Sequence, residues 1–393
     1  MPKVIGIICE YNPFHKGHKY QIDQIRALDP DATVVAIMSG NIVQRGEFAM
    51  ISKYDRAKIA LECGVNAVFE MPYPYSGSCA EIFAKAGVAL ACGLGCDAIC
   101  FGVEKLSLAE LEKIASKVES DEFQATIEDF MQEKSISYIA AKEKAIAKMG
   151  LEVPKYANDM LALEYIRAIK KIGLPLEYMA IKRTGAFYND VSFGDVMSAS
   201  AIRKHYFETG EIASVPECVL KIYGEIISSG GIVKKEAFSA VVHSHCVLSK
   251  MEKKRIFDTS PEMVALIKKV ANKSFSGEDF VSSLSSKVFT TARLKRSILY
   301  SLFNIECVDL PPQFTVLLGM DYKGQALLNS IKKKSGLTVI TKHSDSKKLS
   351  ETASEMLETL YKVDSLYNAL NGDKSTPGGA YKNKPIVKSL GSN

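Results

Sequence analysis

Two histidines flank a glycine near the N-terminus, His15 and His18 in the segment NPFHKGH. The segment follows an apolar run at residues 4–9 and precedes residues 20–28, whose apolar side chains recur with helical spacing. The first amides of a helix have no intrahelical partner, and the helix dipole is positive at that end, so such a junction attracts anions. Each imidazole can donate an N–H to a phosphate oxygen, while Gly17 lets a bulky ligand approach the backbone. The pattern predicts a phosphate site, and the alternative is a helix cap and a surface residue beside an ordinary turn.

Other groups of ligand-forming side chains give weaker signals. Cys92, Cys96 and Cys100 are spaced four apart, which matches no common zinc site and favours small core residues. His243 and His245 would point the same way on a strand, but no second His/Cys cluster lies nearby in the sequence, so we expect no metal there. The nine cysteines are scattered through apolar segments, which indicates reduced thiols rather than a disulfide framework.

Short runs rich in β-branched residues recur in the first half of the chain, with segments of helical spacing between them. The runs are residues 4–9, 33–38, 67–71, 97–102 and 177–182, and the helical segments include 20–28, 53–63 and 80–92. Strands that alternate with helices predict βαβ units around a parallel sheet, and the apolar character of the first two strands predicts cover on both faces. We therefore expect a doubly wound α/β domain, whose ligands bind beyond the carboxyl ends of the strands, where NPFHKGH lies.

The second half of the chain has a different pattern. Strand signals fade beyond about residue 205, and helical patterns follow at 216–230, 260–274, 291–305 and 349–370. A chain of 393 residues exceeds the usual single domain of about 100–200 residues. We expect an α/β domain at residues 1–208 and a mainly helical, basic domain at 209–393.

Net charge and hydropathy limit the partners. A net charge of +5 and a pI near 8.5 permit nucleic-acid binding without requiring it. The candidate contacts to an RNA backbone, each of which alone is more often a solvated face, are Lys234-Lys235, Lys253-Lys254-Arg255, Arg293-Lys295-Arg296 and Lys332-Lys333-Lys334. No apolar run reaches about 18 residues, and the N-terminal segment lacks a small-residue cleavage site, so we expect a cytoplasmic protein without a membrane span.

Two short motifs resemble those of a known superfamily. His15-Lys-Gly-His18 resembles the His-x-Gly-His signature of the HIGH-type nucleotidyltransferases, which bind ATP and transfer or release an adenylyl group. Ser198-Ala-Ser-Ala-Ile-Arg203 resembles their second motif, a Ser-rich turn ending in Ile-Arg that grips the triphosphate. The resemblance implies a Rossmann-like nucleotidyltransferase fold, with residues 1–208 as the ATP-binding domain.

Longer segments are similar to the bacterial tRNA(Met) cytidine acetate ligases. They are GIICEYNPFHKGHKYQI, IMSGNIVQRGEFAMISKYDRAKIAL, VFEMP, CFGVE, YANDMLALEYI and IKRTGAFYND, with a looser likeness continuing to YKNKPIVK near the C-terminus. Membership implies that acetate attacks the α-phosphate of ATP to give acetyl-adenylate and pyrophosphate. The wobble cytidine of elongator tRNA(Met) then takes the acetyl group, becoming N4-acetylcytidine.

The resemblance also implies which residues bind ATP. They are Ile7, Ile8, Cys9, Glu10, Tyr11, Asn12, Pro13, Phe14, His15, Lys16, Gly17, His18, Lys19, Tyr20, Gly102, Asn158, Arg183, Ser200 and Arg203. Gly102 ends a predicted strand, where a missing side chain leaves room for base or ribose. Asn158 could instead be a helix N-cap, and Arg183 a solvated strand end. Ser200 and Arg203 could likewise be an N-cap and a surface arginine.

His18 is the residue that we expect to act in catalysis, by stabilising charge that develops on the α-phosphate or pyrophosphate. No protein nucleophile is needed because acetate itself attacks. Mg²⁺ is expected with ATP, and Glu10 or Glu104 would contact it through water, so we expect no dedicated protein metal site. The loop at residues 39–48, with Gln44, Arg45 and Glu47, suits acetate, phosphate or a flipped cytidine, and the alternative is a solvated connection.

Two other functions remain open at this point. One is a small-molecule adenylyltransferase of the same superfamily, a class that needs no helical region of this size. The other is a non-catalytic RNA-binding protein that kept the fold, for which loss of His15 and His18 would leave RNA affinity intact.

Overall fold

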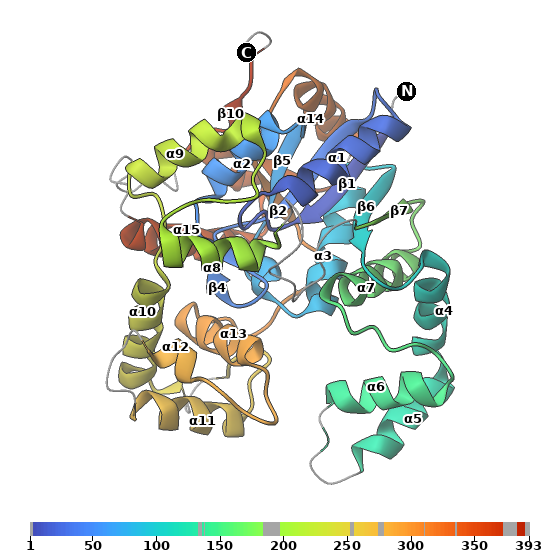
Figure 1. Ribbon diagram of the computed structural model, residues 1–393, viewed down its shortest axis with the longest axis vertical. Coiled ribbons are helices and arrows are strands. Elements are labelled where there is room, and N and C mark those ends of the chain that lie inside the picture. The colour runs from blue at the N-terminus through green and yellow to red at the C-terminus, as the bar shows by residue number, and fades with distance from the viewer. Residues whose placement is uncertain are drawn as a thin grey trace.

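The computed structural model describes residues 3–132, 136, 138–183, 197–251, 255–273, 279–309, 311–334, 336–371 and 383–389. Within them, an eight-stranded sheet runs in the order β10-β8-β5-β2-β1-β6-β7, with β9 paired to β8 (Figure 1). The strands are β1 (Val4–Cys9), β2 (Thr33–Ser39), β5 (Ala67–Met71), β6 (Ala98–Val103), β7 (Glu177–Lys182), β8 (Phe314–Met320), β9 (Thr338–Ile340) and β10 (Ile386–Val387). A separate hairpin pairs β3 (Ile42–Val43) with β4 (Glu47–Phe48).

The first five strands of the sheet are parallel, in agreement with the expected doubly wound fold. The chain builds the sheet outward from β1 through β2 to β5, and then returns to the other side of β1 with β6 and β7. The strand order therefore reverses between β1 and β6, which is where such sheets bind ligands. Every residue of β2 is buried because helices cover both of its faces, as its unbroken apolar sequence predicts.

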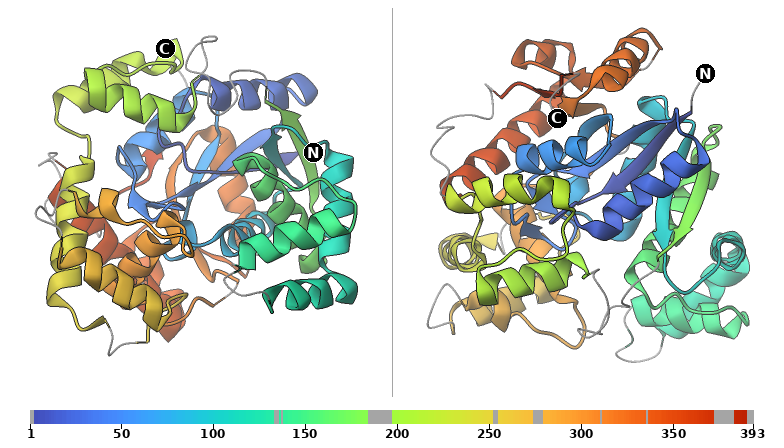
Figure 2. Two further views of the ribbon diagram at one scale, coloured as in Figure 1. Left: turned by 60° about the horizontal axis from the view of Figure 1, so that its bottom comes forward. Right: turned by 45° about the horizontal axis from the view of Figure 1, so that its top comes forward.

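Helices cover the two faces of the sheet, and further helices extend beyond it (Figures 1 and 2). They are α1 (Lys16–Leu28), α2 (Lys53–Glu62), α3 (Ala80–Gly93), α4 (Leu108–Val118), α5 (Asp121–Met131), α6 (Tyr138–Lys148), α7 (Ala157–Ile172), α8 (Ala199–Thr209), α9 (Leu220–Ser228), α10 (Lys235–Leu248), α11 (Pro261–Ala271), α12 (Phe280–Ser283), α13 (Thr291–Leu302), α14 (Tyr322–Lys334) and α15 (Glu351–Leu370). Short 3₁₀ helices are η1 (Tyr75–Gly77), η2 (Glu217–Val219) and η4 (His343–Lys348). In the described residues, none of these helices combines the length and apolar character that crossing a membrane requires.

Three apolar clusters form the core. One packs α1, α2 and α9 on one face of the sheet, and a second packs α3, α7 and α14 on the other. The third joins α10, α11, α13 and α15 in the helical region. In Figure 1, α10–α13 and the α5–α6 pair both lie below the sheet, the former at lower left and the latter at lower right.

The second half of the chain also contributes to the sheet. Strand β8 pairs antiparallel with β5, and β9 and β10 pair with β8. The apolar run FTVLLGM of β8 is short and lies within helical sequence, so its strand character was not predicted. The proposed division after residue 208 remains a prediction, but residues beyond it complete the sheet of the first part.

The strand geometry considered for His243 and His245 is wrong, because both residues lie in α10. In a helix, side chains two apart diverge. His243 Nε2 hydrogen-bonds with the carbonyl of Ala271 at 2.9 Å, and His245 Nε2 with Ser301 Oγ at 2.9 Å. Both side chains thus make packing contacts within the helical region.

A buried charge cluster ties the C-terminal helix α15 to the sheet. Lys53 Nζ contacts Glu70 Oε2 at 2.8 Å and Asp364 Oδ2 at 2.6 Å, and all three side chains are almost fully buried. Asn41 joins them by donating from Nδ2 to Asp364 Oδ1 at 2.9 Å. A single lysine is paired with two carboxylates in this cluster. Burial raises the pKa of Glu70 to about 7.

We expect Glu70→Gln to change how stability depends on pH. Between pH 4.5 and about 7, Glu70 binds a proton more tightly in the folded protein than in the unfolded chain, where its pKa is 4.5. The contribution of this group to the free energy of unfolding therefore increases as the pH falls from about 7 towards 4.5. The difference in unfolding free energy between wild type and variant should change across that window by at most about 1.4 kcal/mol per pH unit. Urea unfolding at pH 5, 6 and 7 measures it, and parallel pH profiles for the two proteins would contradict the assignment.

Candidate functional site

A pocket of about 290 Å³ opens at the carboxyl ends of β1 and β6, where the strand order reverses. Of the nineteen residues expected at the site, fifteen line it: Ile7, Ile8, Cys9, Glu10, Tyr11, Asn12, His15, Gly17, His18, Tyr20, Gly102, Asn158, Arg183, Ser200 and Arg203. Pro13, Phe14, Lys16 and Lys19 do not line it. The chain therefore brings residues from five separated segments to one cavity.

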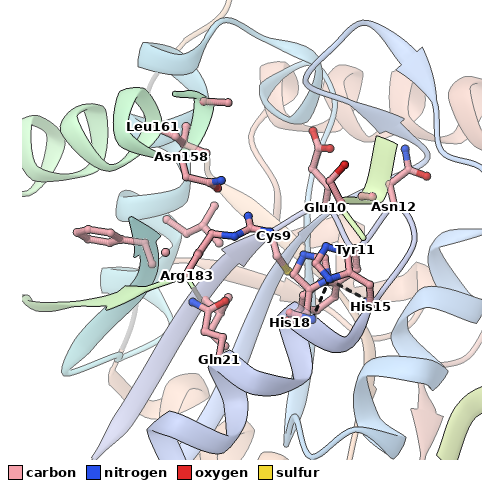
Figure 3. A pocket seen from close by; sticks show the side chains of 18 of the residues that line it. Cys9, Glu10, Tyr11, Asn12, His15, His18, Gln21, Asn158, Leu161 and Arg183 are labelled. Atoms are coloured by element: carbon pink, nitrogen blue, oxygen red, sulfur yellow. Dashed lines mark hydrogen bonds between the residues drawn. The ribbon is translucent and has the colours of Figure 1, made fainter. Parts of the chain in front are cut away.

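The two histidines combine the roles that the sequence left as alternatives. His15 caps α1, its Nδ1 accepting a hydrogen bond from the amide of Gly17 at 3.0 Å. His18 Nδ1 accepts from the amide of His15 at 3.2 Å, and the two rings stack with centroids 3.7 Å apart (Figure 3). Both side chains also line the pocket, so the residues that cap α1 are at the same time pocket-lining residues.

Both imidazoles are neutral. Burial lowers the pKa of His15 to about 3 and that of His18 well below its ordinary value. Because each Nδ1 accepts a backbone hydrogen bond, the ring hydrogen is on Nε2, which is then available to donate. The pair supplies neutral hydrogen-bond donors, and positive charge must come from elsewhere.

Arginines provide that charge. Arg203 Nη1 donates to the carbonyl of Asn12 at 2.6 Å, and Nη2 of the same guanidinium lies 3.5 Å from Glu47 Oε1. Arg203 extends from α8, whose N-cap is Ser198, so a second helix begins at the pocket. Ser200 is therefore inside the first turn of α8, and the alternative of an N-cap at this position is wrong.

Arg183 leaves the end of β7 and lies over Gly102. A Cβ at Gly102 would be 3.3 Å from the Cγ of Arg183. The missing side chain therefore gives room to the stem of the arginine, whereas we expected room for a base or ribose. The amide of Arg183 donates to the carbonyl of Val103 at 3.0 Å, which holds the arginine at this edge.

The Asn158-Asp159 pair organises the loop that follows β6. Asn158 Nδ2 donates to Glu104 Oε1, and Asp159, which is fully buried, accepts from the amides of Glu104, Lys105 and Leu106 at 2.7, 3.0 and 3.2 Å. The N-cap of α7 is Tyr156, so the alternative of Asn158 as the cap is wrong.

A buried arginine holds the loop that carries the histidines. Arg56 is fully buried, and its guanidinium donates to the carbonyls of Glu10, Ser39 and Gly40 at 2.6, 3.0 and 2.6 Å. The same loop is held by Asn12, whose Oδ1 accepts from the amide of Met50 at 2.8 Å. These bonds fix the polar segment between β1 and α1 in one conformation.

The loop of the β3–β4 hairpin connects the pocket to α13. Gln44 and Arg45 line the pocket, and the amide of Gln44 donates to Glu10 Oε1 at 2.9 Å. From α13, Lys295 Nζ binds Glu47 at 3.0 Å and Arg296 donates to the carbonyl of Gln44 at 3.3 Å. The loop is therefore a packed connection rather than a solvated one.

These contacts change the interpretation of the basic clusters. Arg296 is 9% exposed, Lys295 is paired with Glu47, and Arg293 Nη2 binds Asp258 at 2.7 Å, so this cluster makes intramolecular contacts. Lys234, Lys235 and Arg255 are exposed. Lys253 and Lys254 lie outside the described residues, as do the side chains of Lys332–Lys334.

Several lining residues were not predicted. Leu161 and Tyr165 extend the face of α7 that carries Asn158, and Gln21 lies one turn after His18 on α1. Helical spacing from the predicted residues would have identified these positions. Helical spacing could not have identified Phe83, because it lies on α3, which carries none of the predicted site residues.

Comparison with known proteins agrees with this geometry. The model of the HIGH Nucleotidyl Transferase family matches residues 2–380. The tRNA(Met) cytidine acetate ligase of Thermoanaerobacter sp. (strain X514) is 35% identical over 89% of this chain and 91% of its own length. The tRNA(Met) cytidine acetate ligase of Fusobacterium nucleatum is 34% identical over 95% and 96%.

Solved structures are similar over the whole chain. The apo crystal structure of Thermotoga maritima TmcAL has a TM-score of 0.90 at 29% identity, covering 99% of this chain and 100% of that one. The structure of the same protein bound with alpha-thio ATP has a TM-score of 0.89 at 28% identity, with the same coverage. On the family model and these full-length relatives, the chain belongs to the HIGH nucleotidyl transferase family and, within it, to the tRNA(Met) cytidine acetate ligases.

Proposed function

We propose that this enzyme joins acetate to the wobble cytidine of elongator tRNA(Met), using ATP and releasing AMP and pyrophosphate. The observation that supports it best is the pair of neutral histidines stacked at the start of α1, with both Nε2–H groups available to phosphate oxygens. The Thermotoga maritima relative binds alpha-thio ATP, and the relatives named above are cytidine acetate ligases.

The proposed reaction has two steps. An acetate oxygen first forms a bond to the α-phosphorus of ATP while the bond from that phosphorus to pyrophosphate breaks, giving acetyl-adenylate. The exocyclic amine of the cytidine then bonds to the acetyl carbon, the bond from that carbon to the phosphate oxygen breaks, and the amine loses a proton. Neither step needs a protein nucleophile, so the protein contributes position and charge.

The pocket residues suit these demands. The first amides of α1 and the Nε2–H of His18 would donate to oxygens of the α-phosphate, where negative charge develops. Ser200 and Arg203, on the first turns of α8, would hold the leaving pyrophosphate. Arg183 would add positive charge from the end of β7.

Mg²⁺ would enter with the triphosphate and neutralise part of its charge. Such ions are commonly held by one or two carboxylates together with substrate phosphates. Glu10 lines the pocket on the same loop as His15, so it is the carboxylate that we assign to this task. Among the described residues, no group of three or more His, Cys, Asp or Glu side chains could hold a metal without substrate.

The tRNA would approach through the helical region. Lys234 and Lys235 at the start of α10 and Arg255 are exposed cations that can neutralise backbone phosphates. This assignment, the helical domain at residues 209–393 and a cytoplasmic location remain predictions.

The proposal is tested by product analysis. Purified protein is incubated with ATP, Mg²⁺, labelled acetate and elongator tRNA(Met), with controls that each omit one component. We expect label on the tRNA as N4-acetylcytidine, with AMP and pyrophosphate released. Nucleotide binding without incorporation of acetate would favour a small-molecule adenylyltransferase, and RNA binding that needs no ATP would favour a non-catalytic role.

We expect His18→Ala to lower kcat by about 100- to 1,000-fold, because one preorganised donor to the developing charge is lost. The change also removes the acceptor for the amide of His15, which should cost only about 1 kcal/mol of stability. His205→Ala is a matched control, since His205 lies on α8 but does not line the pocket. Steady-state kinetics and thermal unfolding of both variants measure these effects, and a fully active His18→Ala protein would refute the role.

A further inference from the structure

Glu104 lines the pocket and, among the described residues, has one buried carboxylate oxygen without a hydrogen-bond partner. The residue follows the end of β6, lines the pocket and is 6% exposed. Its Oε1 accepts from Asn158 Nδ2, whereas its buried Oε2 has no hydrogen-bond partner among the described residues. Leaving a buried acceptor unsatisfied costs free energy, so a ligand that donates to this oxygen would bind with an advantage.

Two neighbours hold this carboxylate in place. Asp159 fixes the backbone through the amide of Glu104 at 2.7 Å and those of Lys105 and Leu106. Asn158, the residue before Asp159 on α7, fixes the side chain through its hydrogen bond to Oε1. Because both anchors come from the first turn of one helix, the free oxygen is preorganised before a ligand arrives.

The two ends of the pocket differ in hydrogen-bonding character. Figure 3 shows Asn158 and Leu161 at one end, and His15 and His18 at the other. The histidine end offers N–H donors, which suit phosphate oxygens. The end with Glu104 offers a carboxylate, which only accepts when ionised, beside the apolar side chain of Leu161.

A nucleoside triphosphate matches this division. Its phosphates only accept hydrogen bonds from the protein, whereas its nucleoside carries donors, namely the ribose hydroxyls and the 6-amino group of adenine. We propose that Glu104 is a specificity-determining residue that accepts a hydrogen bond from one of these donors. This inference depends on the proposed use of ATP and extends it by naming how the nucleoside is selected.

The test compares nucleotide binding by wild type, Glu104→Gln and Glu10→Gln, measured by calorimetry with and without Mg²⁺ and without tRNA or acetate. The ligands are ATP, 2′-deoxyATP, 3′-deoxyATP and purine riboside triphosphate, which lacks the 6-amino group. Glu104→Gln keeps the acceptor for Asn158 but replaces the free oxygen by a donor. Glu10→Gln is the matched control, because it removes a carboxylate from the other side of the same pocket.

We expect wild type to bind ATP about 10- to 100-fold more tightly than one of the analogues, as for loss of a hydrogen bond to a charged group. In Glu104→Gln that ratio should approach one, and in Glu10→Gln it should persist. The analogue whose ratio collapses identifies the donor as a ribose hydroxyl or the 6-amino group. Glu104→Asp shortens the side chain by one methylene and so moves the carboxylate away from the ligand, and it should lose the same preference for ATP over the analogue. It is the variant to use if Glu104→Gln does not fold.

Two results would overturn the inference. One is retention of every ratio in both Glu104 variants. The other is a weakening of ATP binding by Glu104→Gln only when Mg²⁺ is present, which would make Glu104 a metal ligand. Neither result depends on acetylation, so the test is separate from that of the proposed function. If the wild-type protein acetylates tRNA but the Glu104 variants keep every binding ratio, the proposed function stands and only the role of Glu104 is refuted.

Discussion

The conformation of the pocket depends on a guanidinium buried beneath it. Arg56 donates four hydrogen bonds, all to backbone carbonyls, at Glu10, Ser39, Gly40 and Ile51. These carbonyls lie at the ends of β1 and β2 and in the segment before α2, where the backbone leaves the ladder and would otherwise lack partners. One side chain therefore satisfies the backbone at the point where the chain turns from the sheet into the loops that line the pocket.

Helix α2 supplies both of the buried cations around this point. Arg56 and Lys53 are three residues apart, so they lie on the same face of the helix, towards the sheet. Arg56 binds carbonyls on the pocket side, and Lys53 binds Glu70 and Asp364. Since Asp364 belongs to α15, α2 connects the pocket-lining loops to the C-terminal part of the chain. The loop at residues 44–47 makes a second connection through Lys295 and Arg296 of α13.

The electrostatics of the pocket follow from burial. Stacked imidazoles in a desolvated site stay neutral, so they donate hydrogen bonds without the cost of a buried charge. Permanent charge is left to arginines, whose guanidinium stays protonated when partly buried. A tetra-anionic nucleotide would therefore meet fixed donors, helix N-termini and arginines.

The sequence alone determined the parallel half of the sheet and the site at its edge. Short runs rich in β-branched residues predicted β1, β2, β5, β6 and β7. The nearly continuous apolar sequence of β1 and β2 predicted cover on both faces, because a strand buried on both sides has no polar face. The histidine pair was found because its motif lies between a strand and a helix, and local sequence fixes both. Likewise, the position of Arg203 followed from a short motif.

Tertiary structure decided what local sequence does not encode. Strand β8 owes its place to pairing with β5, about 245 residues earlier in the chain, as the bond from Thr315 Oγ1 to the carbonyl of Glu70 illustrates. Lys53, Arg56 and Arg296 are charged residues on helices, a pattern typical of solvated faces, yet they are buried because distant carbonyls and carboxylates surround them. Glu104 shows the same dependence, since the packing of α7 against β6 gives its carboxylate one partner, Asn158, and leaves its other buried oxygen without one among the described residues. Hydrophobic periodicity is a local property of the chain, whereas the partner of a buried charge is set by which segments the fold brings together.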